Sequence, residues 1–182
     1  MSTKRIGMDI DGVLYPWHTA VYNYLRIYNG CPPPSYRDLW LDPHKYMSEE
    51  KWAYIASLPI LYSTIFPRKG VLDLLNTQDK AGHTIYYITN RESHLERVTR
   101  KYLADHKFPQ LSNLILTKDK EQEVRILEID IFVEDRPKNL EKLAGLCRTI
   151  GIIQPWNEAK QEYLESLGVL FIPYVECLND VL

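Results

Sequence analysis

The most informative segment of this 182-residue chain is Ile6-Gly7-Met8-Asp9-Ile10-Asp11-Gly12-Val13-Leu14. It predicts a short buried strand that ends in two acidic residues, followed by a glycine that lets the backbone turn sharply. Because Asp9 and Asp11 are two residues apart, their side chains point to the same side of an extended chain. Two such charges about 4 Å apart repel each other by roughly 4 kcal/mol at an effective dielectric constant of about 20. The pair therefore indicates a bound cation such as Mg²⁺, a carboxyl that holds a proton, or a solvated acidic turn.

The overall composition, with 45% hydrophobic residues, is that of an ordinary packed globular protein. The net charge of −2 argues against a general nucleic-acid-binding protein, which usually carries a basic excess. No apolar run approaches the ~20 residues that span a bilayer, and the initial Met-Ser-Thr-Lys-Arg contains no apolar signal region. Cys31, Cys147 and Cys177 form no Cys-x-x-Cys pair, which argues against zinc and against a disulfide framework. We therefore expect a cytoplasmic protein with free thiols.

From residue 71 onward, apolar segments of strand length alternate with segments of helical spacing. Helices are predicted over 71–80, 93–106, 121–128, 137–146 and 158–167, and strands over 84–89, 113–117, 129–134, 148–153 and 169–172. Such alternation predicts an α/β fold in which a parallel sheet is covered by helices on both faces, a three-layer Rossmann-like arrangement.

The connection between the first strand and the strand at 84–89 is longer than a crossover requires. A crossover needs roughly a dozen residues plus loops, which leaves about fifty residues to spare. We therefore predict a core of residues 1–15 and 67–182, with a small helical cap inserted over residues 16–66.

Within this cap, apolar spacing predicts a helix over 17–29, and Ser48 is the expected N-cap of a second helix that ends by Pro59. Residues 35–46 are interpreted as a turn-rich stretch. The cap is rich in tyrosine and tryptophan. These rings either form the cap's own core or, in a few cases, face the sheet and stack on a flat substrate group.

Polar residues gather where the predicted strands end, which is where open α/β sheets bind their ligands. Four strand ends carry, in order, Asp9 and Asp11, then Thr89-Asn90-Arg91, then Thr117-Lys118-Asp119-Lys120, then Glu134-Asp135-Arg136. Solvent exposure explains any one of these groups but explains all four together poorly.

This set of motifs resembles the haloacid dehalogenase (HAD) superfamily of phosphatases. The matching segments, in the order of the superfamily, are Asp9-Ile10-Asp11-Gly12-Val13, Ile88-Thr89-Asn90-Arg91, Lys118-Asp119-Lys120 and Phe132-Val133-Glu134-Asp135-Arg136-Pro137. More narrowly, the chain resembles the 5′(3′)-deoxyribonucleotidase family, through Asp-x-Asp-Gly-Val-Leu, the position of the cap, and the Glu-Asp-Arg-Pro ending. The resemblance implies a HAD-like fold and phosphate-ester chemistry.

The resemblance also implies roles for individual residues. Asp9 would be the nucleophile that forms an aspartyl-phosphate, and Asp11 would protonate the leaving alcohol and then activate water. Thr89 and Asn90 would bind the phosphate, and Lys120 would neutralise the nucleophile and the phosphate as a compact charge.

A Mg²⁺ cofactor is implied in the same way. Asp9, the backbone carbonyl of Asp11, and Asp135 would hold the ion, with Glu134 as a direct or water-mediated ligand. Lys118 competes with Lys120 for the lysine position, although the family pattern favours Lys120. Arg91 either contacts phosphate or substrate or pairs with Glu92 or Glu96 at the surface. The candidates for substrate contact are Arg91, Tyr15 and Trp17.

The expected function is therefore Mg²⁺-dependent hydrolysis of (deoxy)ribonucleoside monophosphates. The alternatives are a HAD phosphatase for another small metabolite such as a sugar phosphate, a nucleotide-binding protein without turnover, and a phosphatase that processes polynucleotide ends. We expect a small nucleotide as substrate, with no extended nucleic acid and no membrane as partner. Exposed aromatic residues of the cap could support a homodimer.

Overall fold

The computed structural model describes residues 3–28 and 35–180. Within these ranges, six parallel strands form one sheet in the order β3-β2-β1-β4-β5-β6. The strands are β1 (Arg5–Met8), β2 (Thr84–Thr89), β3 (Leu114–Leu116), β4 (Ile131–Glu134), β5 (Arg148–Ile152) and β6 (Leu170–Ile172). Strand β1 lies at the centre, between β2 and β4. The predicted α/β fold with a parallel sheet is confirmed.

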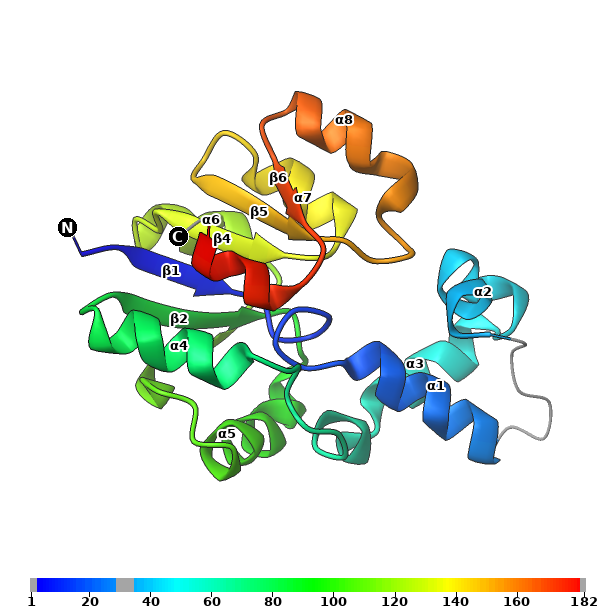
Figure 1. Ribbon diagram of the computed structural model, residues 1–182. Helices are drawn as coiled ribbons and strands as arrows, with labels where there is room; N and C mark the ends of the chain where they lie inside the picture. The colour runs from blue at the N-terminus through cyan, green and yellow to red at the C-terminus, as the bar shows by residue number, and fades with distance from the viewer. Residues whose placement is uncertain (1–2, 29–34, 181–182) are drawn as a thin grey trace.

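Helices cover both faces of this sheet (Figure 1). They are α4 (Val71–Lys80), α5 (Glu96–Asp105), α6 (Lys120–Ile126), α7 (Pro137–Leu143) and α8 (Gln161–Ser166). Strand β4 shows the two-sided burial: Ile131 and Val133 pack in one apolar cluster with Leu74, whereas Phe132 packs in another with Leu143. This alternation is the period of two that a strand imposes on its side chains.

The first strand is shorter than the sequence suggests. It ends at Met8, so Asp9 and Asp11 lie in the loop that follows. Gly7 permits the tight packing of this central strand, because a Cβ atom there would lie 2.5 Å from the Phe132 ring. The loop that follows stays in the core, since Ile10, Val13 and Leu14 are fully buried, and its turn geometry decides where each carboxylate points.

Between β1 and α4, the described residues form three α-helices: α1 (Trp17–Tyr28), α2 (Tyr36–Leu41) and α3 (Glu49–Ser57). They stand to one side of the sheet, beyond the end to which the β1 arrow points (Figure 1). Ser48 caps α3 as predicted, with its hydroxyl accepting from the Lys51 N–H at 3.3 Å. The division into core and cap stays a prediction.

The interpretation of residues 35–46 as turns is wrong in part. Ser35 accepts from the Asp38 N–H at 3.0 Å and so begins α2, which ends before Pro43. A helix of six residues is too short for its apolar spacing to stand out in the sequence. None of the helices in the described ranges is long and apolar enough to span a membrane.

The aromatic residues of this segment pack mainly on one another. Trp17 lies 5.6 Å from Trp52 and 6.3 Å from Trp40, measured between ring centroids, and it stacks on Tyr62 at 5.9 Å. Trp17, Trp40 and Tyr62 are buried. Most of these rings therefore form the core of the segment that contains α1, α2 and α3, which we call the helical segment. A smaller set faces the sheet.

Candidate active site

The loop after β1 is held tightly against the strand ends. The Asp9 N–H donates to the Val133 carbonyl at 3.0 Å, and the Gly12 N–H donates to the Tyr15 carbonyl at 2.8 Å. Gly12 has φ of +88°, and a Cβ atom there would lie 1.9 Å from Oδ2 of Asp135. Glycine is therefore needed at position 12 for its backbone conformation and for the space that Asp135 occupies.

Lys120 joins two of the predicted acidic residues. It is the first residue of α6, and its Nζ atom lies 2.6 Å from Oδ1 of Asp9 and 2.7 Å from Oε2 of Glu134. All three side chains are buried. The structure thus places Lys120 against the predicted nucleophile. Lys118, which is 61% exposed, pairs instead with Glu92 at 2.6 Å.

Glu134 is the best satisfied of the acidic residues. Its Oε1 atom accepts from the backbone N–H groups of Asp135 at 2.9 Å and Arg136 at 3.0 Å, and its Oε2 atom accepts from Lys120 and from Asn139 at 2.9 Å. Burial acts to raise the pKa of Glu134, but the Lys120 charge and these hydrogen bonds outweigh it and lower the pKa to about 2. Glu134 is therefore a fixed negative charge that holds Lys120.

Asp9 and Asp135 show the opposite behaviour. Burial, followed by the charge of Glu134, raises the pKa of Asp9 to about 7 and raises that of Asp135 well above its usual range. Neither carboxylate oxygen of Asp135 has a hydrogen-bond partner among the described residues, although the side chain is fully buried. A buried carboxylate without partners is what a bound cation would satisfy.

A divalent cation fits this donor set. Asp9, Glu134 and Asp135 each offer an oxygen within 4.8 Å of the others. Hard carboxylate oxygens are the ligands that Mg²⁺ prefers. Behind the cluster, Asn157 and Trp156 donate to the Asp135 carbonyl at 2.8 and 3.2 Å, which fixes the backbone of this residue.

Asp11 is not one of the three residues of this cluster, although it lines the same cavity as Asp9. The prediction of an extended strand that reaches Asp11 is wrong, because β1 ends at Met8. The Arg91 guanidinium donates to both Asp11 oxygens, from Nε to Oδ2 at 2.9 Å and from Nη2 to Oδ1 at 2.6 Å. The alternative of a surface pair between Arg91 and Glu92 or Glu96 is also wrong, because Arg91 is buried.

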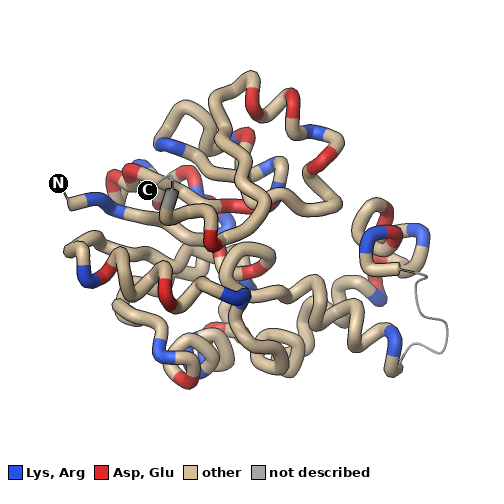
Figure 2. The backbone as a smooth tube through the Cα atoms, in the orientation of Figure 1, with Lys and Arg blue, Asp and Glu red and all other residues tan. Residues whose placement is uncertain are grey.

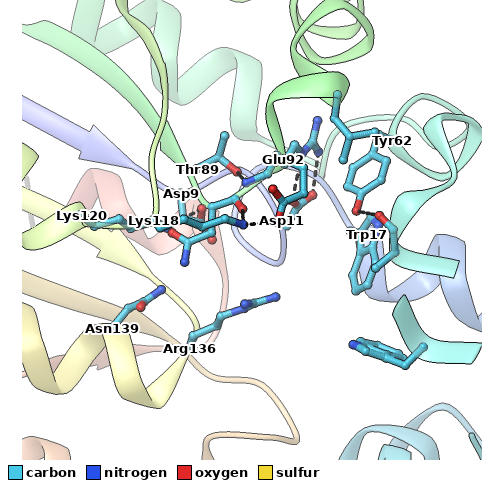
Figure 3. A pocket seen from close by; sticks show the side chains of 15 residues that line it. Asp9, Asp11, Trp17, Tyr62, Thr89, Glu92, Lys118, Lys120, Arg136 and Asn139 are labelled. Atoms are coloured by element: carbon cyan, nitrogen blue, oxygen red, sulfur yellow. Dashed lines mark hydrogen bonds and ion pairs between the residues drawn. The ribbon is translucent and has the colours of Figure 1, made fainter. Parts of the chain in front are cut away.

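Most of the predicted site residues line one cavity of about 200 Å³ (Figure 3), whereas Glu134 and Asp135 are buried and are not among its lining residues. It is lined by Asp9, Asp11, Trp17, Trp52, Ala56, Tyr62, Thr89, Asn90, Arg91, Glu92, Leu95, Lys118, Lys120, Arg136 and Asn139. Figure 3 shows Trp17 and Tyr62 to one side of the acidic residues. Tyr15 is not among the lining residues, since its ring is fully buried and its hydroxyl donates to the Leu61 carbonyl at 2.6 Å.

Several residues of this site could not be predicted from the sequence. Trp52 and Tyr62 stood among the aromatic residues of the cap, but nothing in the sequence indicated which rings face the sheet. Asn139 and Asn157 lie in segments without a recognised motif. The one available signal was the position of Asn139 in the first turn of the helix that begins at Pro137, close to the strand end that carries Glu134.

Residues 47–142 match the HAD superfamily, subfamily IIIB (acid phosphatase). The chain belongs to this family. The matched range includes Thr89, Lys120 and Asp135 but begins after Asp9. The protein named "Putative nucleotidase BH1399" from Halalkalibacterium halodurans is 33% identical over 145 residues, which cover 78% of this chain and 74% of that protein.

Solved structures show the same fold. The HAD-like hydrolase SP0104 from Streptococcus pneumoniae has a TM-score of 0.63 at 13% identity and covers 99% of both chains. The class C acid phosphatase from Bacillus anthracis has a TM-score of 0.54 at 20% identity, covering 97% of this chain and 69% of that one. At these identities the likeness concerns the fold alone.

Proposed function

We propose that this member of the HAD phosphatase family is a Mg²⁺-dependent phosphomonoesterase that hydrolyses (deoxy)ribonucleoside monophosphates through an aspartyl-phosphate on Asp9. The observation that carries the proposal is the pairing of Asp9 with Lys120 beside Asp135, whose buried carboxylate lacks a partner among the described residues. Asp9 and Lys120 line the cavity, and Asp135 lies beside Asp9 in the candidate cation site.

In the first step, an Asp9 oxygen forms a bond to phosphorus while the bond to the leaving alcohol breaks. Asp11 gives its proton to the departing oxygen. In the second step, water attacks the phosphorus of the aspartyl-phosphate, Asp11 takes the water proton, and inorganic phosphate leaves with Asp9 restored. Thr89, which is buried at the end of β2, and Asn90 bind the phosphoryl oxygens.

Lys120 balances the negative charge that develops between Asp9 and the phosphoryl group, and Glu134 keeps its ammonium group in place. Asp9, Asp135 and the Asp11 carbonyl would hold Mg²⁺, which supplies further positive charge at the phosphoryl oxygens. The oxygens of Glu134 already accept four hydrogen bonds, so we assign it to Lys120 rather than to the ion.

Two observations favour a nucleotide as the substrate. Trp17, Trp52 and Tyr62 line the cavity on the side of the helical segment, and aromatic faces of this kind stack well on a flat base. A relative that this chain resembles carries the name nucleotidase. Acidic and basic residues are interspersed along the chain (Figure 2), which favours a small nucleotide over extended nucleic acid. A cytoplasmic location and a homodimer remain part of this proposal.

The test is phosphate release from a panel of 5′- and 3′-ribo- and deoxyribonucleotides and simple sugar phosphates, with Mg²⁺ and again with EDTA. We expect metal-dependent turnover concentrated on nucleotides and its loss in Asp9→Asn. Turnover spread evenly over sugar phosphates would contradict the substrate class. A folded protein that binds nucleotides but releases no phosphate would contradict the enzymatic function altogether.

A further inference from the structure

Each of the three guanidinium nitrogens of Arg91 donates a hydrogen bond at the edge of the cavity. The side chain is 1% exposed. Nε and Nη2 donate to the two oxygens of Asp11, and Nη1 donates to the hydroxyl of Thr99 at 2.9 Å. A planar fork that grips both oxygens fixes the rotation of a carboxylate as well as its distance.

The other contacts fix Arg91 itself. Thr99 donates its hydroxyl proton to the Leu95 carbonyl at 2.8 Å, so its oxygen is free to accept from Arg91. The guanidinium carbon lies 4.6 Å from the centroid of the Tyr62 ring and 5.5 Å from that of Tyr15. Arg91 is therefore held from α5 on one side and from the end of the helical segment on the other.

The backbone at Asp11 forms a β-bridge with Tyr15, whereas its carboxylate is held by Arg91. Asp11 lies in the loop after β1, where Asp9 turns toward Lys120 and Asp11 turns toward Arg91. Its side chain is 14% exposed and lines the cavity. The direction in which this carboxyl faces is consequently set by Arg91 rather than by the strand.

We propose that Arg91 is a positioning residue for proton transfer: it holds the Asp11 carboxyl toward the oxygen of the leaving alcohol. This inference rests on the proposed function, in which Asp11 first donates a proton and then accepts one. The two hydrogen bonds from Arg91 occupy one lone pair on each Asp11 oxygen, so the proton of the acid is held on one of the remaining lone pairs. When that O–H bond breaks and the leaving oxygen gains the proton, the carboxylate that remains keeps both donors of Arg91. Its position is thus the same when the water proton arrives in the second step.

A comparison of two substrates with different leaving groups distinguishes a residue that positions the acid from one that only stabilises the fold. A nucleoside is a poor leaving group that needs a proton, whereas p-nitrophenolate leaves without one. kcat/KM reports the step in which the alcohol departs, so it is measured for a nucleoside monophosphate and for p-nitrophenyl phosphate. Arg91→Lys keeps the charge and loses the fork. Thr99→Val keeps Arg91 and removes one of its supports.

We expect Arg91→Lys to lower kcat/KM on the nucleotide about 10- to 100-fold and to lower it far less on p-nitrophenyl phosphate, because acid catalysis typically contributes 10²–10⁴-fold. Asp11→Asn should show the same dependence on the leaving group more strongly, and Thr99→Val more weakly. Arg100→Ala is the matched control, since Arg100 pairs with Glu96 on the exposed side of the same helix. It should leave both rates unchanged.

Equal losses on the two substrates in Arg91→Lys, or no loss on the nucleotide, would overturn the positioning role while leaving the proposed function intact. If Asp11→Asn itself loses equally on both substrates, the assignment of Asp11 as the acid fails and the inference fails with it. Thermal unfolding of each variant shows whether it is folded, and if Arg91→Lys does not fold, Thr99→Val decides the question by the same comparison.

Discussion

Lys120 is the residue on which the charge balance of the buried site depends. It is a fully enclosed cation between two carboxylates, Asp9 and Glu134. A buried ion pair is weak evidence for stability in itself, but removing one partner leaves the other charge uncompensated in a medium that solvates it poorly.

We therefore predict that Lys120→Met lowers the free energy of unfolding by about 3–5 kcal/mol, measured by urea denaturation in EDTA. Lys118→Met is the matched control two residues away. Because Lys118 is largely exposed, its pair with Glu92 should contribute only about 0–1 kcal/mol. Similar losses in the two variants would contradict the assignment of Lys120 as the buried counter-charge.

His18 gives a prediction that depends on pH. Its ring stacks on Trp156 at 3.8 Å and meets the edge or face of Trp40 at 4.5 Å, between centroids. Burial, and then the positive charges of Arg136 and Arg68, lower the pKa of His18 well below its usual value. The folded protein therefore keeps His18 neutral in a range where the unfolded chain already binds a proton.

Since the unfolded state binds more protons below about pH 6.5, stability falls as the pH falls through this value. The effect is isolated as the difference in unfolding free energy between wild type and His18→Phe. We predict that the wild type loses stability relative to His18→Phe as the pH falls from 7 to 5, by at most about 1.4 kcal/mol per pH unit. Parallel pH profiles for the two proteins would contradict a neutral, buried His18.

At the scale of elements, the loop after β1 depends on Gly12. The positive φ of Gly12 strains any other residue, and the space beside it is filled by Asp135. Gly168, in the turn before β6, has φ of +92°, but no atom of the described residues lies within 4 Å of a Cβ atom placed there. Both glycines therefore have a left-handed backbone conformation, but only at Gly12 would a side chain collide with a neighbour.

We predict that Gly12→Ala and Gly168→Ala both lose roughly 1–2 kcal/mol of stability through left-handed strain. Only Gly12→Ala should also lose most of its phosphatase activity, because the added methyl group displaces the Asp135 carboxylate. Thermal denaturation and phosphate release measure the two effects separately. Full activity in a folded Gly12→Ala would show that Asp135 is not confined in this way.

The alternating pattern from residue 71 onward made the sheet and its covering helices predictable, because buried parallel strands are continuous apolar runs. The helix at 71–80 and the strand at 84–89 have the predicted ends. The same topology brought the four polar strand ends to one edge of the sheet. The end of β1 at Met8 was not predictable, because it depends on a turn stabilised by local backbone hydrogen bonds.

The contacts that the site residues make with one another also could not be predicted from the sequence. Arg91 and Asp11 are 80 positions apart and carry no periodic signal that links them. The choice of Trp17 and Tyr62 over Tyr15 as lining residues depends on how the helical segment packs, since all three are aromatic and buried. Residue types and strand ends therefore indicated the chemistry, and tertiary packing decided the contacts.

At the scale of the whole molecule, the cavity joins two kinds of surface. Asp9 and Lys120 line it near the strand ends, with Asp135 buried beside Asp9, and the segment between β1 and α4 supplies aromatic rings. Under the proposed function, the first group carries out the chemistry and the aromatic rings select the leaving group. All the roles that we propose for these residues require an aspartyl-phosphate intermediate on Asp9.

The most direct test is to quench the protein with acid during turnover of a nucleoside monophosphate in Mg²⁺ and to locate any added phosphoryl group by peptide mass spectrometry. We predict one phosphoryl group on Asp9. In Asp11→Asn it should accumulate when p-nitrophenyl phosphate is the substrate, because its leaving group departs without a proton whereas water is no longer activated. Steady turnover with no phosphoryl group on the protein, or with the group on another residue, would contradict Asp9 as the nucleophile.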